Sequence, residues 1–164
     1  MAGPAGDQPL DAADRGRATD GASVRELGAE DTTSAWLVLG ELRPALDSLE
    51  GFTAELVRLR DGHGYRLVGA FEGETLAAVA GFHLARNLAW GLYLYVDDLV
   101  TREACRRRGH GTRLLAWLEA EARRLGCREL HLDSGLQRTG AHAFYAAHGL
   151  EQSSLHFRTT SPGR

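Results

Sequence analysis

The sequence has no lysine and no isoleucine among its 164 residues, so all 19 of its Lys+Arg positions are arginine. Without lysine, the chain can form no side-chain Schiff base with a carbonyl substrate. It also cannot carry a phosphate-binding loop of the GxxxxGK(S/T) type, which depends on its lysine. Two classes of mechanism are therefore excluded.

The sequence also lacks the spacing patterns of cysteine and histidine that are typical of disulfide frameworks and metal sites. The two cysteines, Cys105 and Cys127, do not have CxxC spacing, and we expect no disulfide framework. The seven histidines form neither an HExxH motif nor paired His/Cys spacing. We therefore expect no metal site.

Long apolar runs and a strong net charge are also missing. No apolar run approaches the length of a membrane span, and the N-terminus has no basic-then-apolar signal pattern, so we expect a cytoplasmic protein that is not bound to membranes. A formal net charge of −3 gives no reason to expect nucleic-acid binding. The length suits one domain and is short for two.

The order of predicted elements indicates the fold class. Residues 1–22 have almost no large apolar side chains, which predicts a disordered tail before a domain over residues 23–164. The periodicity of the remaining sequence predicts ten elements in the order β-α-α-β-β-β-α-β-α-β. They are a strand at 24–27, two helices within 32–62 broken at Pro44, strands at 66–71, 75–84 and 89–101, a helix between Gly111 and Gly126, a strand at 129–133, a helix at 141–148 and a strand at 153–160. This order is typical of a single α/β domain.

Residues 97–112 form the segment with the clearest chemistry. A strand leads into an arginine- and glycine-rich loop, and the loop opens onto an amphipathic helix. Gly109 and Gly111 allow backbone N–H groups to approach a ligand, and the helix N-terminus adds partial positive charge. The pattern indicates a phosphate or pyrophosphate site. A dinucleotide-binding GxGxxG is disfavoured because Leu114 stands at its third glycine, whereas a solvated arginine-rich turn stays open as the alternative.

Two stretches in register resemble a known family. Arg106-Arg107-Arg108-Gly109-His110-Gly111 matches the (Q/R)xxGx(G/A) signature of the GNAT superfamily of acyl-CoA N-acyltransferases, and its flank DDLVTREACRRRGHG keeps that family's spacing. Downstream, AHAFYAAHGL resembles AxxFYxxxGF. The resemblance runs from about residue 23 to 160. It implies a single GNAT-like α/β domain with a mixed, mostly antiparallel central sheet, flanking helices and splayed central strands.

The resemblance also implies a cofactor site for acetyl-CoA as co-substrate. Backbone N–H groups from Arg107 to Thr112 would hold the pyrophosphate, and the strand edge near Leu99 would bind the pantetheine arm, with the Leu99 N–H donating to the acetyl carbonyl. The residues assigned to the cofactor are Leu99, Val100, Thr101, Arg106, Arg107, Arg108, Gly109, His110, Gly111, Thr112 and Arg138. Three positions depart from the family pattern: Glu103 replaces a common proline, Thr101 a common valine and Arg138 a common asparagine.

Three residues are candidates for catalysis. By the resemblance, Tyr145 is the general acid, although it can equally be a core residue beside Phe144. Asp97 is the candidate base; strand alternation places it on one face with Leu99 and Thr101, and Asp98, the reserve, on the other. Both aspartates can also be solvated residues of a strand end. His83 and His131 are lesser candidates.

The expected reaction is acetyl transfer from acetyl-CoA to a primary amine of a small molecule. A polyamine, an amino-sugar antibiotic and an amino acid all stay open as acceptors, in a pocket roofed by residues 32–62. The alternatives are acetylation of a protein lysine or N-terminus and a non-catalytic acyl-CoA-binding module. A homodimer is an open possibility for the assembly.

Overall fold

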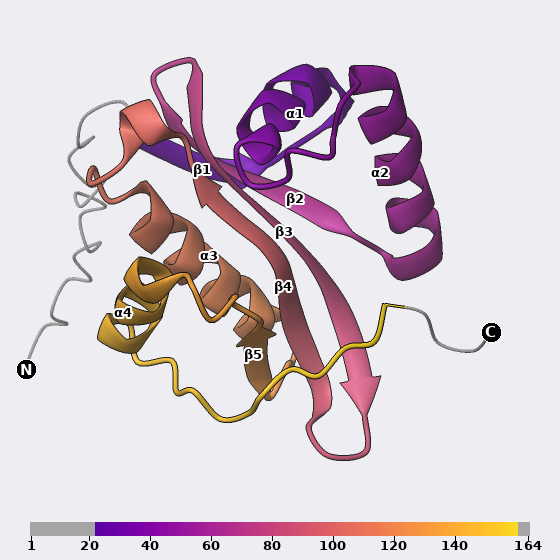
Figure 1. The fold of residues 1–164 in the computed structure, drawn as a ribbon, viewed down its shortest axis with the longest axis vertical. Helices are drawn as coiled ribbons and strands as arrows, with labels where there is room; N and C mark the ends of the chain where they lie inside the picture. The colour runs from indigo at the N-terminus through magenta and orange to yellow at the C-terminus, as the bar shows by residue number, and fades with distance from the viewer. Residues whose placement is uncertain (1–21, 161–164) are drawn as a thin grey trace, which may run out of the picture.

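The computed structural model describes residues 22–160 and shows one open sheet with helices on both faces (Figure 1). Of the tail expected over residues 1–22, residues 1–21 lie outside the described residues, and Ala22 already belongs to the first strand. The elements are β1 (Ala22–Glu26), η1 (Ala29–Asp31), α1 (Thr32–Gly40), α2 (Leu49–His63), β2 (Arg66–Glu72), β3 (Thr75–Asn87), β4 (Gly91–Thr101), η2 (Glu103–Cys105), α3 (His110–Arg124), β5 (Glu129–Leu132) and α4 (Thr139–Ala147).

The sheet has the strand order β1-β2-β3-β4-β5. The first four strands are antiparallel neighbours, and β5 pairs with β4 in parallel. α1 and α2 cover one face, whereas α3 and α4 lie on the other (Figure 1). The structure confirms the predicted mixed, mostly antiparallel sheet. No helix within residues 22–160 is both long and apolar enough to cross a membrane.

Local sequence signals explain where the early helices begin and end. The Ser48 side chain accepts a hydrogen bond from the Gly51 N–H at 3.1 Å and so caps α2 at its N-terminus. Gly64 ends the helix with φ 63°, a left-handed conformation that glycine adopts without strain. Pro44 lies between α1 and α2, where it was predicted to break the helix.

The predicted C-terminal strand over 153–160 is wrong. Residues 151–160 form no strand, and two of their apolar side chains, Leu155 and Phe157, are 65% and 86% exposed. The alternating pattern is present, but a strand needs a paired neighbour and a face on which to bury its apolar side chains. The segment instead crosses the sheet near β5, where His156 Nδ1 lies 3.3 Å from Asp133 Oδ2.

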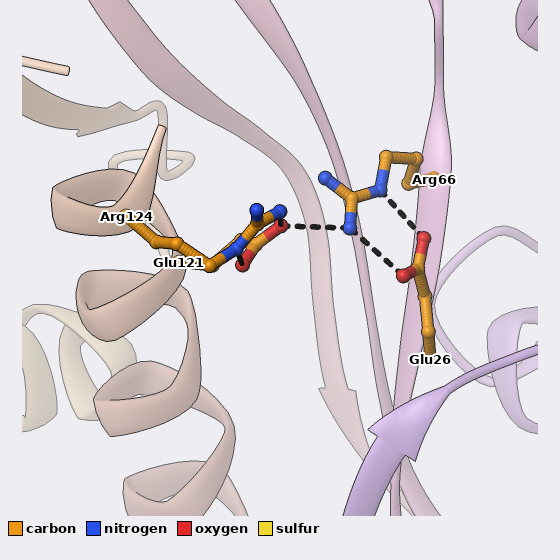
Figure 2. Close-up of polar contacts among 4 residues, drawn as sticks. All are labelled: Glu26, Arg66, Glu121 and Arg124. Atoms are coloured by element: carbon orange, nitrogen blue, oxygen red, sulfur yellow. Dashed lines mark hydrogen bonds and ion pairs between the residues drawn. The ribbon is translucent and has the colours of Figure 1, made fainter. Parts of the chain in front are cut away.

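Four charged residues tie β1 and β2 to α3 (Figure 2). Arg66 pairs with Glu26 through two contacts, at 2.5 and 2.8 Å, and its Nη2 also lies 2.8 Å from Glu121 Oε1. Arg124 holds the same Glu121 carboxylate through two 2.7 Å hydrogen bonds. The Glu121 side chain is only 7% exposed, and these arginines, Arg124 first, lower its pKa from the ordinary 4.5 to about 2.

We predict that Glu121→Gln destabilises the fold by about 1–2 kcal/mol at pH 7, because it removes a charge from hydrogen bonds to two arginines. The folded-state pKa of Glu121 is depressed, so its contribution is present above the unfolded pKa of 4.5 and is lost as the pH falls towards about 2. Urea unfolding at pH 7, 4 and 3 measures this difference. The control is Glu119→Gln, because Glu119 lies on the same helix 4.0 Å from Arg123 and is more exposed. If Glu121→Gln lowered the free energy of unfolding by the same amount at every pH, the prediction would be contradicted.

Candidate active site

The central strands separate halfway along the sheet. β5 pairs with β4 only from Tyr93–Glu129 to Val96–Leu132, while β4 continues to Thr101 with β3 as its partner. Figure 1 accordingly shows β5 beside the first half of β4 only. The structure confirms the predicted splay, which leaves one edge of β4 without a strand neighbour from Asp97 onwards.

The pairing pattern shows which backbone groups face that free edge. Arg102 N donates to Ala77 O at 2.9 Å, so this pair is a hydrogen-bonded one. Hydrogen-bonded and non-hydrogen-bonded pairs alternate along antiparallel strands. Leu99 and Thr101 are therefore in non-hydrogen-bonded pairs with β3. Their backbone N–H and C=O groups point towards the other edge of β4, where β5 no longer pairs. An extended ligand could bind there as an additional strand.

The loop between β4 and α3 presents a row of free backbone donors. Within residues 22–160, no N–H from Arg107 to Thr112 donates a hydrogen bond. Arg107 and Gly109 have φ of 64° and 80°, and alternation of such residues with right-handed ones turns successive N–H groups into a concave anion site. A Cβ on Gly111 would lie 3.4 Å from Phe144 and 3.8 Å from the Thr101 hydroxyl, in van der Waals contact with α4 and the end of β4.

Side chains of the same loop fasten it to the β2–β3 hairpin. Arg108 Nη1 donates to both carboxylate oxygens of Glu72 at 3.0 Å. The 2%-exposed His110 has its Nε2 3.5 Å from Glu72, and its Nδ1 accepts from Arg113 at 3.3 Å. Arg106 Nε donates to Thr101 O at 3.3 Å. The Arg108 and His110 side chains thus support the loop, while the backbone N–H groups stay available to a ligand.

α4 docks on the N-terminal turn of α3 and carries Tyr145. His148 Nδ1 donates to Phe144 O at 2.8 Å, so its Nε2 accepts from the Thr112 hydroxyl at 3.0 Å. Tyr145 is half-buried, and its hydroxyl has no hydrogen-bond partner within the described part of the chain. Burial raises the pKa of the Tyr145 phenol, and the Arg138 charge opposes that rise.

A β-bulge changes the direction of the two aspartates. Phe82 pairs with Val96 and Gly81 pairs with Asp98, so Asp97 is an extra residue on β4 without an opposite partner. The expectation that Asp97 and Asp98 face opposite sides of the sheet is therefore wrong. Strand alternation holds only without an inserted residue, and the bulge turns both carboxylates to the face covered by α1 and α2.

Their neighbours show this common face. Asp97 contacts His83, and Asp98 contacts Tyr65. Val79 and Tyr65 belong to the core under α1 and α2, and His83 shares the Val79 side of β3. Leu99, by contrast, packs into the core against α3. The predicted shared face of Asp97 with Leu99 and Thr101 does not exist.

Asp98 is held from two sides. Its Oδ1 accepts from Arg43 Nε at 2.7 Å and its Oδ2 accepts from the Tyr65 hydroxyl at 2.8 Å. The Tyr65 hydroxyl lies directly over Gly81, where even a Cβ atom would overlap it. Burial, followed by the Asp98 charge, raises the pKa of the Tyr65 phenol, which therefore stays a hydrogen-bond donor.

A cavity of about 260 Å³ opens beside Asp98, under the helices α1 and α2. Phe52 and Leu56 of α2 line it together with Arg43, Tyr65 and Asp98. Its position agrees with the pocket predicted under residues 32–62. Its lining is mostly apolar, and its charged groups are the Arg43–Asp98 ion pair and the Glu55 carboxylate.

Asp97 keeps a different partner. Its Oδ2 lies 2.7 Å from His83 Nδ1, and the ring of Tyr95 packs against His83 with centroids 5.5 Å apart. Burial raises the pKa of the Asp97 carboxyl, and the hydrogen bond from His83 lowers it in part.

Sequence reasoning did not identify Arg43, Tyr65 and Glu72 as parts of the site. Each lies more than 30 residues along the chain from its partner, and none belongs to a motif. No local signal could have found them. His83 was only a lesser candidate, although the structure brings it to Asp97.

Comparisons with known proteins identify the family. Residues 24–150 match the acetyltransferase (GNAT) family. The chain is 33% identical over 116 residues to the uncharacterized N-acetyltransferase YhdJ of Bacillus subtilis, across 71% of this chain and 81% of that protein. It is 32% identical over 142 residues to the aminoalkylphosphonate N-acetyltransferase of Salmonella typhimurium, across 84% of this chain and 88% of that enzyme.

Solved structures share the fold. An aminoglycoside N-acetyltransferase, AAC(6')-Iy, in complex with CoA superposes with a TM-score of 0.74 at 16% identity, over 85% of this chain and 95% of that one. An acetyltransferase of Trypanosoma brucei superposes with a TM-score of 0.72 at 21% identity, over 85% and 99%. From its sequence match over residues 24–150, the chain belongs to the GNAT family of acetyltransferases and is an acetyl-CoA-dependent N-acetyltransferase.

Proposed function

We propose that this enzyme transfers the acetyl group of acetyl-CoA to a primary amine of a small molecule. The observation that carries the proposal is the free edge of β4. It starts at the row of backbone donors before α3 and ends at the bulge, where Asp97 and Asp98 turn to the opposite face of the sheet. A cofactor along this edge would present its acetyl group between the two faces.

The cofactor would be held mainly by the backbone. The N–H groups from Arg107 to Thr112 suit a pyrophosphate, because they are unpaired and lie at a helix N-terminus. The free edge at Leu99 and Thr101 suits the pantetheine amides. The Leu99 N–H would donate to the acetyl oxygen, on which negative charge develops in the transition state.

Tyr145 is suited to protonate the departing thiolate. Burial raises the pKa of its phenol, so the proton is present at neutral pH. A positioned proton donor of this kind contributes about 10²–10⁴-fold to the rate. Arg138, whose charge lowers the pKa of the same phenol, would be a further contact for phosphate or pantetheine groups.

The acceptor side favours a small cationic amine. Asp97 and Asp98 face the cavity side of the sheet, and the cavity of about 260 Å³ has a size that suits a small molecule. The names of the relatives, an aminoalkylphosphonate and an aminoglycoside N-acetyltransferase, also describe enzymes for small-molecule amines. Polyamines, amino sugars, amino acids and aminoalkylphosphonates are the acceptors to compare.

A panel assay of thiol release from acetyl-CoA tests the proposal. Each acceptor class is supplied in turn, together with a lysine-containing peptide and a free peptide N-terminus. We expect turnover with at least one small amine. Turnover only with peptides would make the enzyme a protein acetyltransferase, and cofactor binding without any turnover would make it a non-catalytic binding module.

We predict that Gly111→Val removes the stabilisation of the protein by acetyl-CoA. The wild type at about 100 times Kd should gain about 2.7 kcal/mol from the cofactor, which corresponds to a rise in Tm of about 5–10 °C. In the variant, the Cβ would contact Phe144, and the two methyl groups beyond it would occupy the ligand's path to the backbone N–H groups. Thermal unfolding with and without acetyl-CoA measures the effect. Gly62→Val is the control, because nothing lies within 4 Å of a Cβ at Gly62; an unchanged shift in Gly111→Val would place the cofactor elsewhere.

We predict that Tyr145→Phe lowers kcat by about 100- to 1,000-fold and leaves acetyl-CoA binding unchanged, because the ring still packs while the proton donor is lost. Steady-state kinetics with the best acceptor, together with a thermal shift, separates the two effects. Tyr93→Phe is the matched control, since Tyr93 lies near the other end of β4 from Thr101. A wild-type kcat for Tyr145→Phe would make Tyr145 a packing residue.

A further inference from the structure

His83 and Asp97 form a side-chain pair on the acceptor face of the sheet. His83 Nδ1 lies 2.7 Å from Asp97 Oδ2, and the two side chains are 25% and 33% exposed. The pair is thus partly buried, and Asp97 directly precedes Asp98, which lines the cavity. From the sequence, His83 is only a lesser catalytic candidate, and no motif includes it.

The β-bulge is what creates this pair. In a regular strand, Asp97 would lie on the opposite face of β4 from Asp98, away from His83. The inserted residue turns its carboxylate towards β3, where His83 stands opposite Tyr95. Bulges of this kind commonly redirect a side chain near an active site. Leu99, whose N–H we assign to the acetyl oxygen, follows only two residues later on β4.

The hydrogen bond determines which nitrogen of His83 can act as a base. An ionised carboxylate only accepts hydrogen bonds, so Nδ1 carries the proton and Nε2 keeps its lone pair. A carboxylate that fixes the tautomer of a histidine in this way also stabilises the imidazolium after proton uptake. The Tyr95 ring packs against the imidazole at 5.5 Å and limits its rotation.

We propose that Nε2 of His83 is the general base that takes the proton from the acceptor ammonium group, and that Asp97 is a positioning residue which holds the His83 ring. This inference rests on the proposed amine acetylation. An amine with a pKa near 10 is only about one part in a thousand unprotonated at pH 7, so a base near the acceptor has a large effect.

The protons and bonds balance in this scheme. One N–H bond of the ammonium group breaks as its proton moves to Nε2 of His83. The amine lone pair then forms a C–N bond with the acetyl carbon, the C–S bond breaks, and the thiolate takes the Tyr145 proton. The new amide nitrogen returns its surplus proton to the Tyr145 oxygen, and the His83 imidazolium releases its proton to water.

The other charged and titratable groups around the pair already have hydrogen-bond partners within the protein. Both Asp98 oxygens accept hydrogen bonds, from Arg43 and from Tyr65. The Tyr95 hydroxyl donates to Asp133. Arg43 also donates to the Asp97 carbonyl oxygen at 3.0 Å. His83 Nε2 therefore stands out as a basic atom without an assigned partner among the described residues.

The pH dependence of kcat/KM from pH 6 to 10 tests the proposal in the full-length enzyme, with the best acceptor of the panel. We expect His83→Gln to lower kcat/KM by about 100-fold at pH 7 and by less than about threefold at pH 10, where the amine is already largely unprotonated. Asp97→Asn should show the same trend with a smaller defect at pH 7, because the histidine remains but is no longer held. His63→Gln, at the end of α2, is the control and should follow the wild type.

Two outcomes would overturn the proposal. One is a pH profile of His83→Gln parallel to that of the wild type; the other is a pH-dependent defect in His131→Gln instead. An unchanged thermal shift with acetyl-CoA in each variant separates a lost base from a lost fold or cofactor site. If the wild-type enzyme acetylates none of the amines, the proposed function is rejected, whereas the His83–Asp97 hydrogen bond is tested separately below.

A second measurement does not need an acceptor. Nitrogen-15 NMR of the imidazole groups should show His83 as the Nδ1–H tautomer at pH 8, and this preference should be lost in Asp97→Asn. A proton on Nε2 in the wild type would overturn the proposal, because that nitrogen could not then accept one.

Discussion

The β-bulge at Asp97 inserts one residue between the Phe82–Val96 and Gly81–Asp98 pairs of the sheet. Before it, Val96 packs against α3; after it, Leu99 does so. This change of phase turns two consecutive carboxylates to the face under α1 and α2. It occurs at the position where β5 leaves β4, so one strand segment both opens the edge and supplies the acids.

The two faces of β4 then carry different chemistry. On the α3 side, the proposed anion site consists of backbone N–H groups at a helix N-terminus, and the Arg108 side chain holds the loop to Glu72. On the α1–α2 side, side chains dominate: Asp98 is neutralised by Arg43, and Asp97 is left with His83. Cofactor binding can therefore remain constant while the acceptor side varies with residues of α1, α2 and their connection.

Local patterns in the sequence predicted the elements well where one residue type decides the conformation. Pro44 separates the first two helices, and Gly126 directly follows the last turn of α3. The prediction failed where conformation depends on distant partners. Leu155 and Phe157 alternate as in a strand, yet no neighbouring strand pairs with them in the described part of the chain.

In the candidate site, too, the features that local sequence predicted differ from those that depend on distant residues. The free donors of the loop follow from the glycines and the helix start, which are local signals. The faces of Asp97 and Asp98 do not, because a period of two cannot show an inserted residue. Partners such as Tyr65, 33 residues from Asp98 along the chain, are brought there only by the folded sheet.

Gly81 has no side chain, and the hydrogen bond between Tyr65 and Asp98 depends on that absence. The Tyr65 hydroxyl reaches the carboxylate by crossing the space that any Cβ at this position would fill. Variation of the acceptor pocket during evolution or laboratory selection is therefore constrained at a residue that does not line the cavity. Arg43 and the α2 side chains can change with the acceptor, whereas a single methyl group on β3 would displace the tyrosine and leave the acid with one partner fewer.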